Sequence, residues 1–289
     1  MKLCRYAPDR VGVIRDAAVH DVSSIVEKLP RHGWPYPTHD VLIAQLATLR
    51  AAIEKLADRA HPRALAEVEL LSPVANPGKV VVAGTNYADH IEEAARDPTI
   101  AHGRQVNRSL EEKGVFVKAT SSIVGPSQGV AQRFPERRND HEVELCAIIG
   151  RAANRVSAER ALDYVAGYTI GLDMTVRGTE HPGLRKSIDS YTVLGPCLVT
   201  ADELGDPQAL ELKLWVNGEQ RQGSSTRHMI SGIARLIEYA SQFYTLHPGD
   251  VLMTGTPAGV SPVKPGDVIE AEIERIGRMR VAVRLAWNA

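Results

Sequence analysis

The chain of 289 residues is long enough for one large domain, or for one large and one small domain. Its 34 lysines and arginines balance 35 aspartates and glutamates, and no basic arm disturbs that balance, so nucleic acid and anionic membranes are not expected partners. The three cysteines are far apart and odd in number, which excludes a disulfide framework and a cysteine zinc site and fits a reducing compartment.

The amino-terminal residues carry no sign of export. They lead into no apolar signal-peptide core, and no apolar run of the chain approaches the roughly 18 residues that a membrane-spanning helix needs. We therefore expect a soluble, cytoplasmic protein without a membrane partner.

The first 72 residues predict a small amino-terminal domain. Residues 1–20 alternate weakly in hydrophobicity around a turn at Asp9-Arg10, which is the pattern of a short hairpin. Apolar residues recur at helical spacing over 41–57 and predict an amphipathic helix. Proline and glycine then cluster in 72–78. We place the boundary there, with a small domain over 1–72 and a catalytic domain over 73–289.

The second part of the chain is rich in predicted strands, which do not alternate regularly with helices. That pattern predicts an α+β fold and argues against a doubly wound nucleotide-binding fold. The sequence Asn217-Gly218 is the strongest hairpin signal. The predicted strands cover 79–83, 115–118, 142–149, 165–172, 197–200, 210–216, 220–223, 268–276 and 279–285, and the predicted helices cover 157–164 and 230–243.

Two glutamates begin a strand that otherwise turns apolar on both faces. Side chains alternate along a strand, so Glu142 and Glu144 share one face, about 6–7 Å apart. A strand buried on both sides does not carry two carboxylates into the core unless something positive meets them. A divalent cation is one answer and a pair of arginines or lysines is another. The third alternative is that 142–144 protrudes into water.

Asp173 strengthens the metal hypothesis, because it ends the next weakly apolar run and so lies at the mouth of a strand. An aspartate in such a place is most often a turn or cap residue. Three carboxylates without a nearby histidine or cysteine ligand, however, suit a hard ion such as Mg²⁺, Mn²⁺ or Ca²⁺ better than zinc.

His90 and Glu93 form a possible acid–base pair. On a helical turn they are i and i+3 neighbours, so the carboxylate could orient the imidazole. The long polar stretch that follows, about 92–113, is either a lid over an active site or a plain surface loop. A solvated histidine beside a glutamate is the structural alternative for the pair itself.

Taken in order, several segments resemble the fumarylacetoacetate hydrolase family over about three quarters of the chain. The matching segments are Asn76-Pro77-Gly78-Lys79, Gly84-Thr85-Asn86-Tyr87-Ala88-Asp89-His90, Phe116-Val117-Lys118, His141-Glu142-Val143-Glu144-Leu145 with Ile149-Gly150, Gly167-Tyr168-Thr169 with Asp173-Met174-Thr175-Val176-Arg177, Arg185-Lys186-Ser187 with Leu194-Gly195-Pro196, and Gly255-Thr256-Pro257-Ala258-Gly259-Val260.

The resemblance implies a mixed β-roll catalytic domain behind a small amino-terminal domain, usually as a homodimer. It further implies metal ligands, a catalytic dyad on a lid, two catalytic lysines and residues that contact the substrate. Carried over by position, the metal ligands for Mg²⁺ or Mn²⁺ are Glu142, Glu144 and Asp173, the dyad is His90 and Glu93, the lysines are Lys118 and Lys186, and the substrate-contacting residues are Arg177, Thr256 and Tyr87.

The same resemblance implies an activity. The leading expectation is a metal-dependent hydrolase that cleaves a carbon–carbon bond in a β-diketo acid such as an acylpyruvate, with water activated by His90 and Glu93. Alternatives are a lyase or isomerase of the same fold, acting on oxaloacetate-like acids or hydroxydienoates, and a binding protein without catalysis.

Glu180 departs from the family pattern, because many relatives have a glutamine at the equivalent position. An ionised glutamate repels a substrate carboxylate to which an amide can donate a hydrogen bond. Either Glu180 faces away, paired with Arg185 or another cation, or the preference of the site has changed. Both alternatives predict a substrate with a longer or less charged tail than oxaloacetate.

Overall fold

A mixed sheet of twelve strands runs through the computed structural model, which describes residues 1–103 and 109–286. Its strand order is β4-β3-β2-β1-β14-β12-β11-β17-β6-β7, with β5 beside β1 and β8 beside β14. A second sheet has the order β16-β15-β18-β19-β9, and β10 and β13 form a separate pair. This strand-rich architecture confirms the predicted α+β fold.

The elements are bounded as follows. The strands are β1 Lys2–Tyr6, β2 Arg10–Arg15, β3 Ala18–Asp21, β4 Pro62–Ala64, β5 Leu70–Leu71, β6 Val80–Ala83, β7 Val115–Lys118, β8 Ile123–Val124, β9 Val130–Gln132, β10 Asn139–Asp140, β11 Val143–Ile149, β12 Val165–Asp173, β13 Thr175–Val176, β14 Thr192–Thr200, β15 Glu211–Val216, β16 Glu219–Ser225, β17 Val251–Met253, β18 Val268–Ile273 and β19 Gly277–Leu285. The α-helices are α1 Val41–Ala44, α2 Leu46–Ala57, α3 Ala88–Arg96, α4 Pro98–Ala101, α5 Leu110–Lys113, α6 Ala158–Ala161, α7 Pro182–Arg185, α8 Ala201–Leu204 and α9 Ile233–Phe243. Short 3₁₀ segments cover Ser23–Lys28, Leu65–Glu67, Thr120–Ser122, Pro126–Gln128, Leu162–Tyr164 and Thr226–His228.

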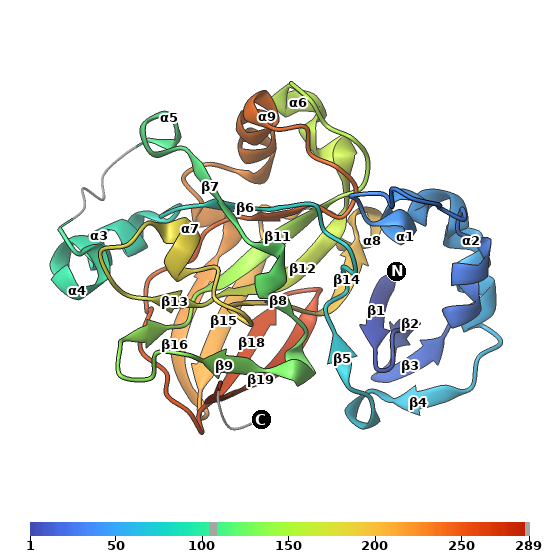
Figure 1. Cartoon of the computed structure of the whole chain (residues 1–289), viewed down its shortest axis with the longest axis horizontal. Helices are drawn as coiled ribbons and strands as arrows, with labels where there is room; N and C mark the ends of the chain where they lie inside the picture. The colour runs from blue at the N-terminus through green and yellow to red at the C-terminus, as the bar shows by residue number, and fades with distance from the viewer. Residues whose placement is uncertain (104–108, 287–289) are drawn as a thin grey trace.

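The amino-terminal strands lie at one end of the molecule, and α3 and α4 lie at the opposite end (Figure 1). β1 pairs antiparallel with β14, with Lys2 opposite Val199 and Leu3 opposite Leu198. The amino-terminal segment therefore extends the main sheet rather than packing as a detached unit. The division into domains at residue 72 stays a prediction.

Strand β11 is buried on both faces, as its apolar pattern predicts. Val143 and Leu145 pack into the main core, whereas Cys146 and Ile148 join a second cluster that also contains Ile53 of α2. Both faces are filled because the sheet is covered on each side. Glu142 and Glu144 have the same parity as Cys146, so they lie on the face of that second cluster.

The local predictions differ from the structure mainly at element ends. The hairpin at Asn217-Gly218 is confirmed, and both residues have positive φ, 51° and 84°, as a tight turn of this kind requires. The helix predicted over 41–57 is interrupted at Gln45, and the strand predicted at 197–200 begins earlier, at Thr192. Within the described residues, no helix is both long enough and apolar enough to cross a membrane.

Candidate active site

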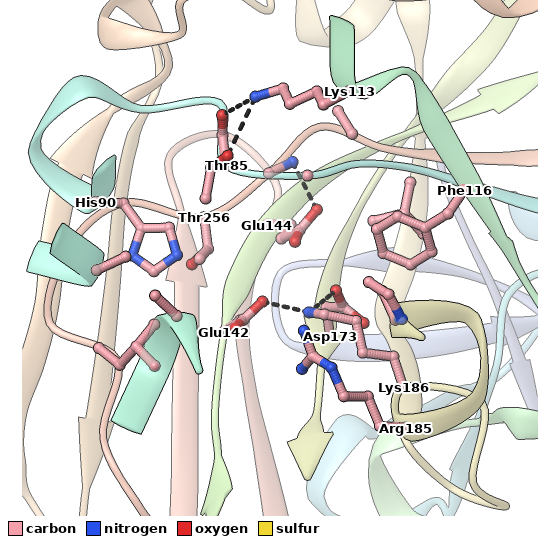
Figure 2. A pocket seen from close by; sticks show the side chains of 18 of the residues that line it. Thr85, His90, Lys113, Phe116, Glu142, Glu144, Asp173, Arg185, Lys186 and Thr256 are labelled. Atoms are coloured by element: carbon pink, nitrogen blue, oxygen red, sulfur yellow. Dashed lines mark hydrogen bonds and ion pairs between the residues drawn. The ribbon is translucent and has the colours of Figure 1, made fainter. Parts of the chain in front are cut away.

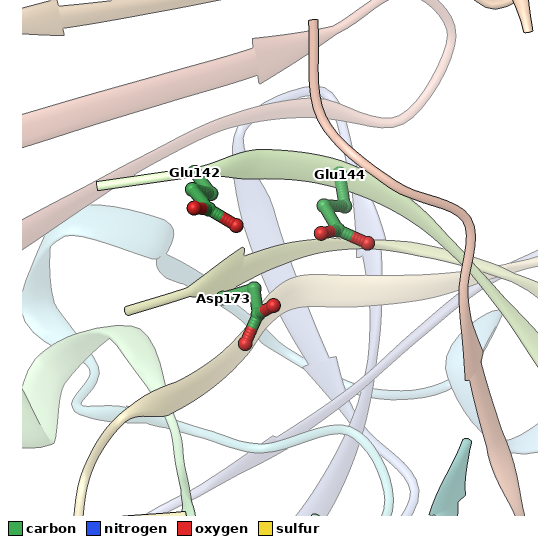
Figure 3. A group of neighbouring side chains, drawn as sticks. All are labelled: Glu142, Glu144 and Asp173. Atoms are coloured by element: carbon green, nitrogen blue, oxygen red, sulfur yellow. The ribbon is translucent and has the colours of Figure 1, made fainter. Parts of the chain in front are cut away.

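Three buried carboxylates meet where β11 and β12 run side by side (Figure 3). The strands are antiparallel with Val143 opposite Leu172, and the Asp173 amide donates to the Glu142 carbonyl at 2.9 Å. This register brings Asp173 next to the two glutamates. One oxygen from each of Glu142, Glu144 and Asp173 lies within 4.8 Å of the others, and each residue is at most 4% exposed.

Cations surround two of the three carboxylates. Lys186 Nζ lies 2.6 Å from Glu142 Oε2 and also bonds Asp173, while Arg177 Nη2 lies 2.9 Å from Glu142 Oε1. Lys118 is completely buried and donates to Asp173 Oδ1 at 2.6 Å and to the Tyr191 carbonyl at 2.9 Å. Burial lowers the pKa of Lys118, and the charge of Asp173 opposes that change.

The two glutamates differ in their electrostatics. Burial, followed by the charge of Asp173, raises the pKa of Glu144 well above its ordinary value. Burial acts in the same direction on Glu142, but the charges of Lys186 and Arg177 outweigh it and hold the pKa of that carboxyl below its ordinary value. Glu144 is therefore the carboxylate whose ionised form needs a further positive charge.

The donor set fits a hard divalent ion. Two ligands of one ion at the Mg²⁺ to Ca²⁺ bond lengths lie at most about 4–5 Å apart, so the three carboxylates can meet at a single ion. All three donors are carboxylate oxygens, which Mg²⁺ and Mn²⁺ prefer over zinc-type nitrogen and sulfur ligands. An added cation would also offset the unfavourable ionisation of Glu144.

A histidine–glutamate pair lies on α3, as the spacing predicts. His90 Nδ1 is 2.8 Å from Glu93 Oε2, and Glu93 Oε1 accepts the Gly259 backbone N–H at 2.9 Å. Both carboxylate oxygens of Glu93 are thus engaged, which fixes the imidazole and leaves its Nε2 as the free nitrogen of the ring. The ring points toward Thr256 (Figure 2), so the structural alternative of a solvated histidine does not apply.

A buried polar network holds Thr256 at the cavity. The Thr256 hydroxyl donates to the Val143 carbonyl at 2.8 Å and accepts from Gln222 Nε2 at 2.8 Å. Gln222 Oε1 in turn accepts from the Val143 amide, at 3.1 Å, and contacts His141 Nδ1 at 3.0 Å. Burial lowers the pKa of His141 to about 4, so this histidine is neutral at pH 7.

The three carboxylates and His90 face one cavity of about 220 Å³ (Figure 2). Seven of the ten predicted site residues line it, namely His90, Glu142, Glu144, Asp173, Arg177, Lys186 and Thr256. Glu93 supports His90, and Lys118 lies behind Asp173. Tyr87 is fully buried but is not among the lining residues, and its hydroxyl has no hydrogen-bond partner among the described residues.

Sequence reasoning did not single out several residues of the cavity wall. Lys113, Phe116 and Arg185 line the cavity, from the end of α5, from β7 and from α7. No spacing rule connects these segments, because the fold alone brings them together. The sequence carries no signal that Arg185 faces inward, because charged side chains are seldom buried and its neighbour Lys186 is already expected at the site.

The predicted lid region, 92–113, forms much of one wall. Ala94, Ile100 and Ala101 line the cavity, but residues 104–108 lie outside the described part of the chain. Arg138 connects this wall to the site. Its Nη1 bonds Asp97 Oδ2 at 2.8 Å, and its Nε bonds Asp140 Oδ1 at 2.8 Å. Asp140 Oδ2 then accepts from Arg177 Nε at 2.7 Å.

Comparison with known proteins identifies the group to which this arrangement belongs. A family model described as the carboxyl-terminal part of fumarylacetoacetate hydrolase matches residues 79–284. The chain belongs to the fumarylacetoacetate hydrolase family. The predicted resemblance is thereby confirmed.

Individual members of the fumarylacetoacetate hydrolase family match most or nearly all of the chain. The maleylpyruvate hydrolase of Aquipseudomonas alcaligenes is 50% identical over 98% of this chain and 99% of its own length. A crystal structure of maleylpyruvate hydrolase from Sphingobium sp. SYK-6, in complex with manganese(II) and pyruvate, is 36% identical over 99% of both chains, with a TM-score of 0.83. The mitochondrial oxaloacetate tautomerase of Xenopus laevis is 37% identical over 80% of this chain and 73% of its own. The expectation of a hydrolase acting on a carbon–carbon bond of a β-diketo acid is confirmed.

Proposed function

We propose that this protein hydrolyses an acylpyruvate similar to maleylpyruvate, releasing pyruvate and the carboxylic acid of the acyl tail. The observation that carries the proposal is the meeting of the His90–Glu93 dyad and the carboxylate triad in one cavity. Hydrolysis needs an activated water, whereas the lyase and isomerase reactions of this fold do not. The 50% identity with a maleylpyruvate hydrolase supports the same reaction.

The ion held by Glu142, Glu144 and Asp173 would supply Lewis-acid polarisation of the carboxylate and keto oxygens of the 2-oxo acid. His90, oriented by Glu93, accepts a proton from the water that attacks the acyl carbonyl. The bond between the acyl carbon and the adjacent methylene then breaks, and its electron pair stays with the pyruvate fragment. That methylene carbon takes up one proton, so acylpyruvate and water give acid and pyruvate.

The cations of the wall stabilise the negative charge that develops on the pyruvate fragment. Lys186 Nζ and Arg177 already lie at the carboxylate cluster, and Lys118 supports it from behind. Fixed charges in a site screened from water act strongly and need no reorganisation during the reaction. Thr256, held by Gln222, is positioned to bond a substrate oxygen.

Purified protein incubated with maleylpyruvate and Mg²⁺ or Mn²⁺ tests the proposal directly. We expect maleate and pyruvate in equal amounts, identified by mass, with one ¹⁸O from labelled water in the maleate. The values of kcat/KM for fumarylpyruvate, acetylpyruvate and oxaloacetate then show which group attached to the 2-oxo acid the enzyme prefers. Failure to cleave any acylpyruvate, in metal-loaded protein, contradicts the proposal.

Tautomerisation of oxaloacetate is the second candidate, favoured by the 37% identity with an oxaloacetate tautomerase. That reaction moves a proton without adding water, and the same cavity contains the acid–base group and the metal ligands that it needs. Labelled water separates the two reactions, because only hydrolysis places ¹⁸O in a newly formed carboxylate.

Three finer expectations belong to the same proposal. Mg²⁺ or Mn²⁺ is the working ion, the protein is a homodimer, and it acts in the cytoplasm. Metal analysis of protein purified without chelator, light scattering after size exclusion, and cell fractionation test them in turn.

A further inference from the structure

The side chain of Gln222, on β16, is held in one orientation by two backbone groups. Its Oε1 accepts the Val143 amide at 3.1 Å, and its Nε2 donates to the Pro257 carbonyl at 2.9 Å. Exchanging the amide oxygen and nitrogen would bring two donors together at Val143 and two acceptors together at Pro257. Gln222 is buried, so such a mismatch would be costly. The side chain therefore presents an N–H donor to its third partner.

That third partner is the Thr256 hydroxyl. Gln222 Nε2 lies 2.8 Å from Thr256 Oγ1, so the hydroxyl oxygen accepts a hydrogen bond from the amide. Thr256 Oγ1 also lies 2.8 Å from the Val143 carbonyl oxygen, which can only accept, so the hydroxyl proton is directed there. Val143 is completely buried, and turning this proton toward the cavity would take the donor away from a buried carbonyl.

Thr256 is consequently only a hydrogen-bond acceptor toward the cavity that it lines. A threonine hydroxyl has one proton and two lone pairs. Val143 takes the proton and Gln222 takes one lone pair, so a single lone pair remains. Thr256 cannot donate to a carboxylate or carbonyl oxygen of the substrate. The group that it bonds must itself carry a proton.

His90 presents a second acceptor to the same cavity. Glu93 Oε2 lies 2.8 Å from His90 Nδ1, and a carboxylate accepts, so in the neutral imidazole the proton is on Nδ1 and the lone pair is on Nε2. Figure 2 shows the ring directed toward Thr256, and both residues line the cavity. Two neighbouring acceptors suit a molecule that donates two hydrogen bonds from one oxygen. Water is such a molecule.

We infer that Thr256 and His90 together orient the attacking water, and that Gln222 is the positioning residue that keeps the Thr256 hydroxyl an acceptor. This deepens the acylpyruvate hydrolase proposal and rests on it. The water donates one hydrogen bond to His90 Nε2 and the other to Thr256 Oγ1. Its lone pairs are then directed away from both residues, toward the acyl carbon of the substrate.

The bonds to the two residues match the steps of the reaction. The water oxygen bonds to the acyl carbon while one proton passes to His90 Nε2, and the π electrons of the carbonyl move onto its oxygen. The second proton stays on the new hydroxyl, which is now part of the substrate and still donates to Thr256. When the carbon–carbon bond breaks, this hydroxyl leaves in the carboxylic acid. The proton accepted by His90 balances the one that the methylene carbon of the pyruvate fragment takes up.

Crystal structures of the Mn²⁺-loaded protein with pyruvate test the water site without turnover. In the wild type we expect one water within hydrogen-bonding distance of both His90 Nε2 and Thr256 Oγ1, and in Thr256→Val we expect that water to be lost. A pyruvate oxygen bonded directly to Thr256 Oγ1 would overturn the inference. So would a wild-type complex in which no water is shared by the two residues.

Kinetics of two Thr256 variants test the role in the reaction. In Thr256→Val, kcat for the best acylpyruvate should fall about 10–100-fold, because the water is no longer oriented. The Kd of pyruvate, measured by titration calorimetry on Mn²⁺-loaded protein, should stay within about 2-fold, because Thr256 makes no bond to the 2-oxo acid. Thr256→Ser keeps the hydroxyl and should retain kcat within about 3-fold. Much weaker pyruvate binding in Thr256→Val, or an unchanged kcat, would contradict the inference.

Thr254→Val is the matched control for the lost hydroxyl bond. The Thr254 hydroxyl donates to the Leu145 carbonyl at 2.9 Å, as the Thr256 hydroxyl does to Val143, but Thr254 is not among the residues that line the cavity. Both valine variants should lower Tm by a similar amount, and only Thr256→Val should lower kcat. An equal loss of kcat in Thr254→Val would mean that weakening this segment alone slows the enzyme, and the inference would be wrong.

A double variant tests whether Gln222 acts through Thr256. Gln222→Met should lower kcat about 10-fold without changing the Kd of pyruvate, because the hydroxyl loses the donor that keeps it an acceptor. Thr256→Val combined with Gln222→Met should be no slower than Thr256→Val alone, since the two residues act as a unit. Multiplying losses would overturn the positioning role. The Thr256 variants decide the water site even if Gln222→Met does not fold.

The outcomes also separate this inference from the proposed function. If wild-type crystals contain the shared water but the enzyme cleaves no acylpyruvate, the hydrolase proposal fails and the water site remains. If acylpyruvates are cleaved and Thr256→Val is as fast as the wild type, the hydrolase proposal stands and the inference is wrong.

Discussion

Arg137 holds Glu180 in a two-bond ion pair, with Nη1 to Oε1 and Nη2 to Oε2 both at 2.9 Å. The hydrogen bonds from Arg137 lower the pKa of Glu180 to about 2, so the carboxylate is ionised under all working conditions. Glu180 is not among the residues that line the cavity. Of the two alternatives that the sequence left open for Glu180, this arrangement favours the one in which the side chain faces away.

Glu180→Gln should therefore change little. Because the side chain is bonded to Arg137 outside the cavity, we expect kcat/KM for maleylpyruvate and for oxaloacetate to stay within about 2-fold of wild type, as for a surface pair. Steady-state kinetics with both substrates measure this. A large rise in oxaloacetate turnover would mean that Glu180 reaches the substrate.

Substitutions of the metal ligands should differ in their effect on the free energy of unfolding. Both Glu144→Gln and Asp173→Asn should lower kcat by about 10³-fold or more, because Lewis-acid stabilisation contributes several kcal/mol. Burial and Asp173 already oppose ionisation of Glu144, so Glu144→Gln should leave the metal-free protein as stable as wild type. Asp173→Asn removes the buried partner of Lys118 and should cost about 3 kcal/mol.

Measurements of metal content and kcat check the predicted loss of activity, and denaturant unfolding in EDTA checks the predicted difference in stability. Wild-type activity removed by EDTA should return with Mn²⁺ or Mg²⁺, and neither variant should recover. Full activity in protein proved metal-free by mass spectrometry would exclude the metal mechanism. Equal stability of the two variants would mean that the Lys118–Asp173 pair is not important for the fold.

Removing the base should leave the metal in place. His90 lines the cavity and bonds Glu93, not the carboxylate cluster, so His90→Ala should lower kcat by about 10²–10⁴-fold with unchanged metal content. Glu93→Gln is the matched test of orientation and should give a smaller loss. If His90→Ala retains wild-type kcat, another group activates the water.

The sequence was informative where chemistry follows from local periodicity. Alternation along 142–149 correctly placed Glu142 and Glu144 on one face, and i, i+3 spacing correctly joined His90 to Glu93. Both relationships span a few residues of one element. The register that adds Asp173 needed only the neighbouring strand, which follows in the chain.

Relationships between distant segments were not predictable in this way. Arg137 meets Glu180 across 43 residues, and His141 meets Gln222 across 81 residues. No period or propensity encodes such partners, since they depend on how whole strands pair. The same reason explains why the sequence indicates Arg185 only as a partner of Glu180, and why it does not predict the pairing of β1 with β14.

We expect Arg138 to hold the cavity wall formed by α3 and α4 in place. It joins Asp97, at the amino-terminal end of α4, to Asp140, which bonds Arg177 at the carboxylate cluster. In Arg138→Gln these ion pairs are lost, so 92–103 should exchange amide hydrogens faster, because its local opening is less costly. We expect KM to rise several-fold with metal content unchanged, since the cavity wall is looser but the metal ligands are intact. Hydrogen exchange with mass spectrometry, with and without pyruvate and Mn²⁺, measures the change in exchange rate.

Arg96→Gln is the matched control. Arg96 pairs with Glu92 on the exposed face of α3, so its substitution should alter neither the exchange rate nor KM. Faster exchange in both variants would show that any charge removed from this region loosens it, and unchanged exchange in Arg138→Gln would show that the wall is held by its apolar contacts, Ala94 and Ile100 with Val260.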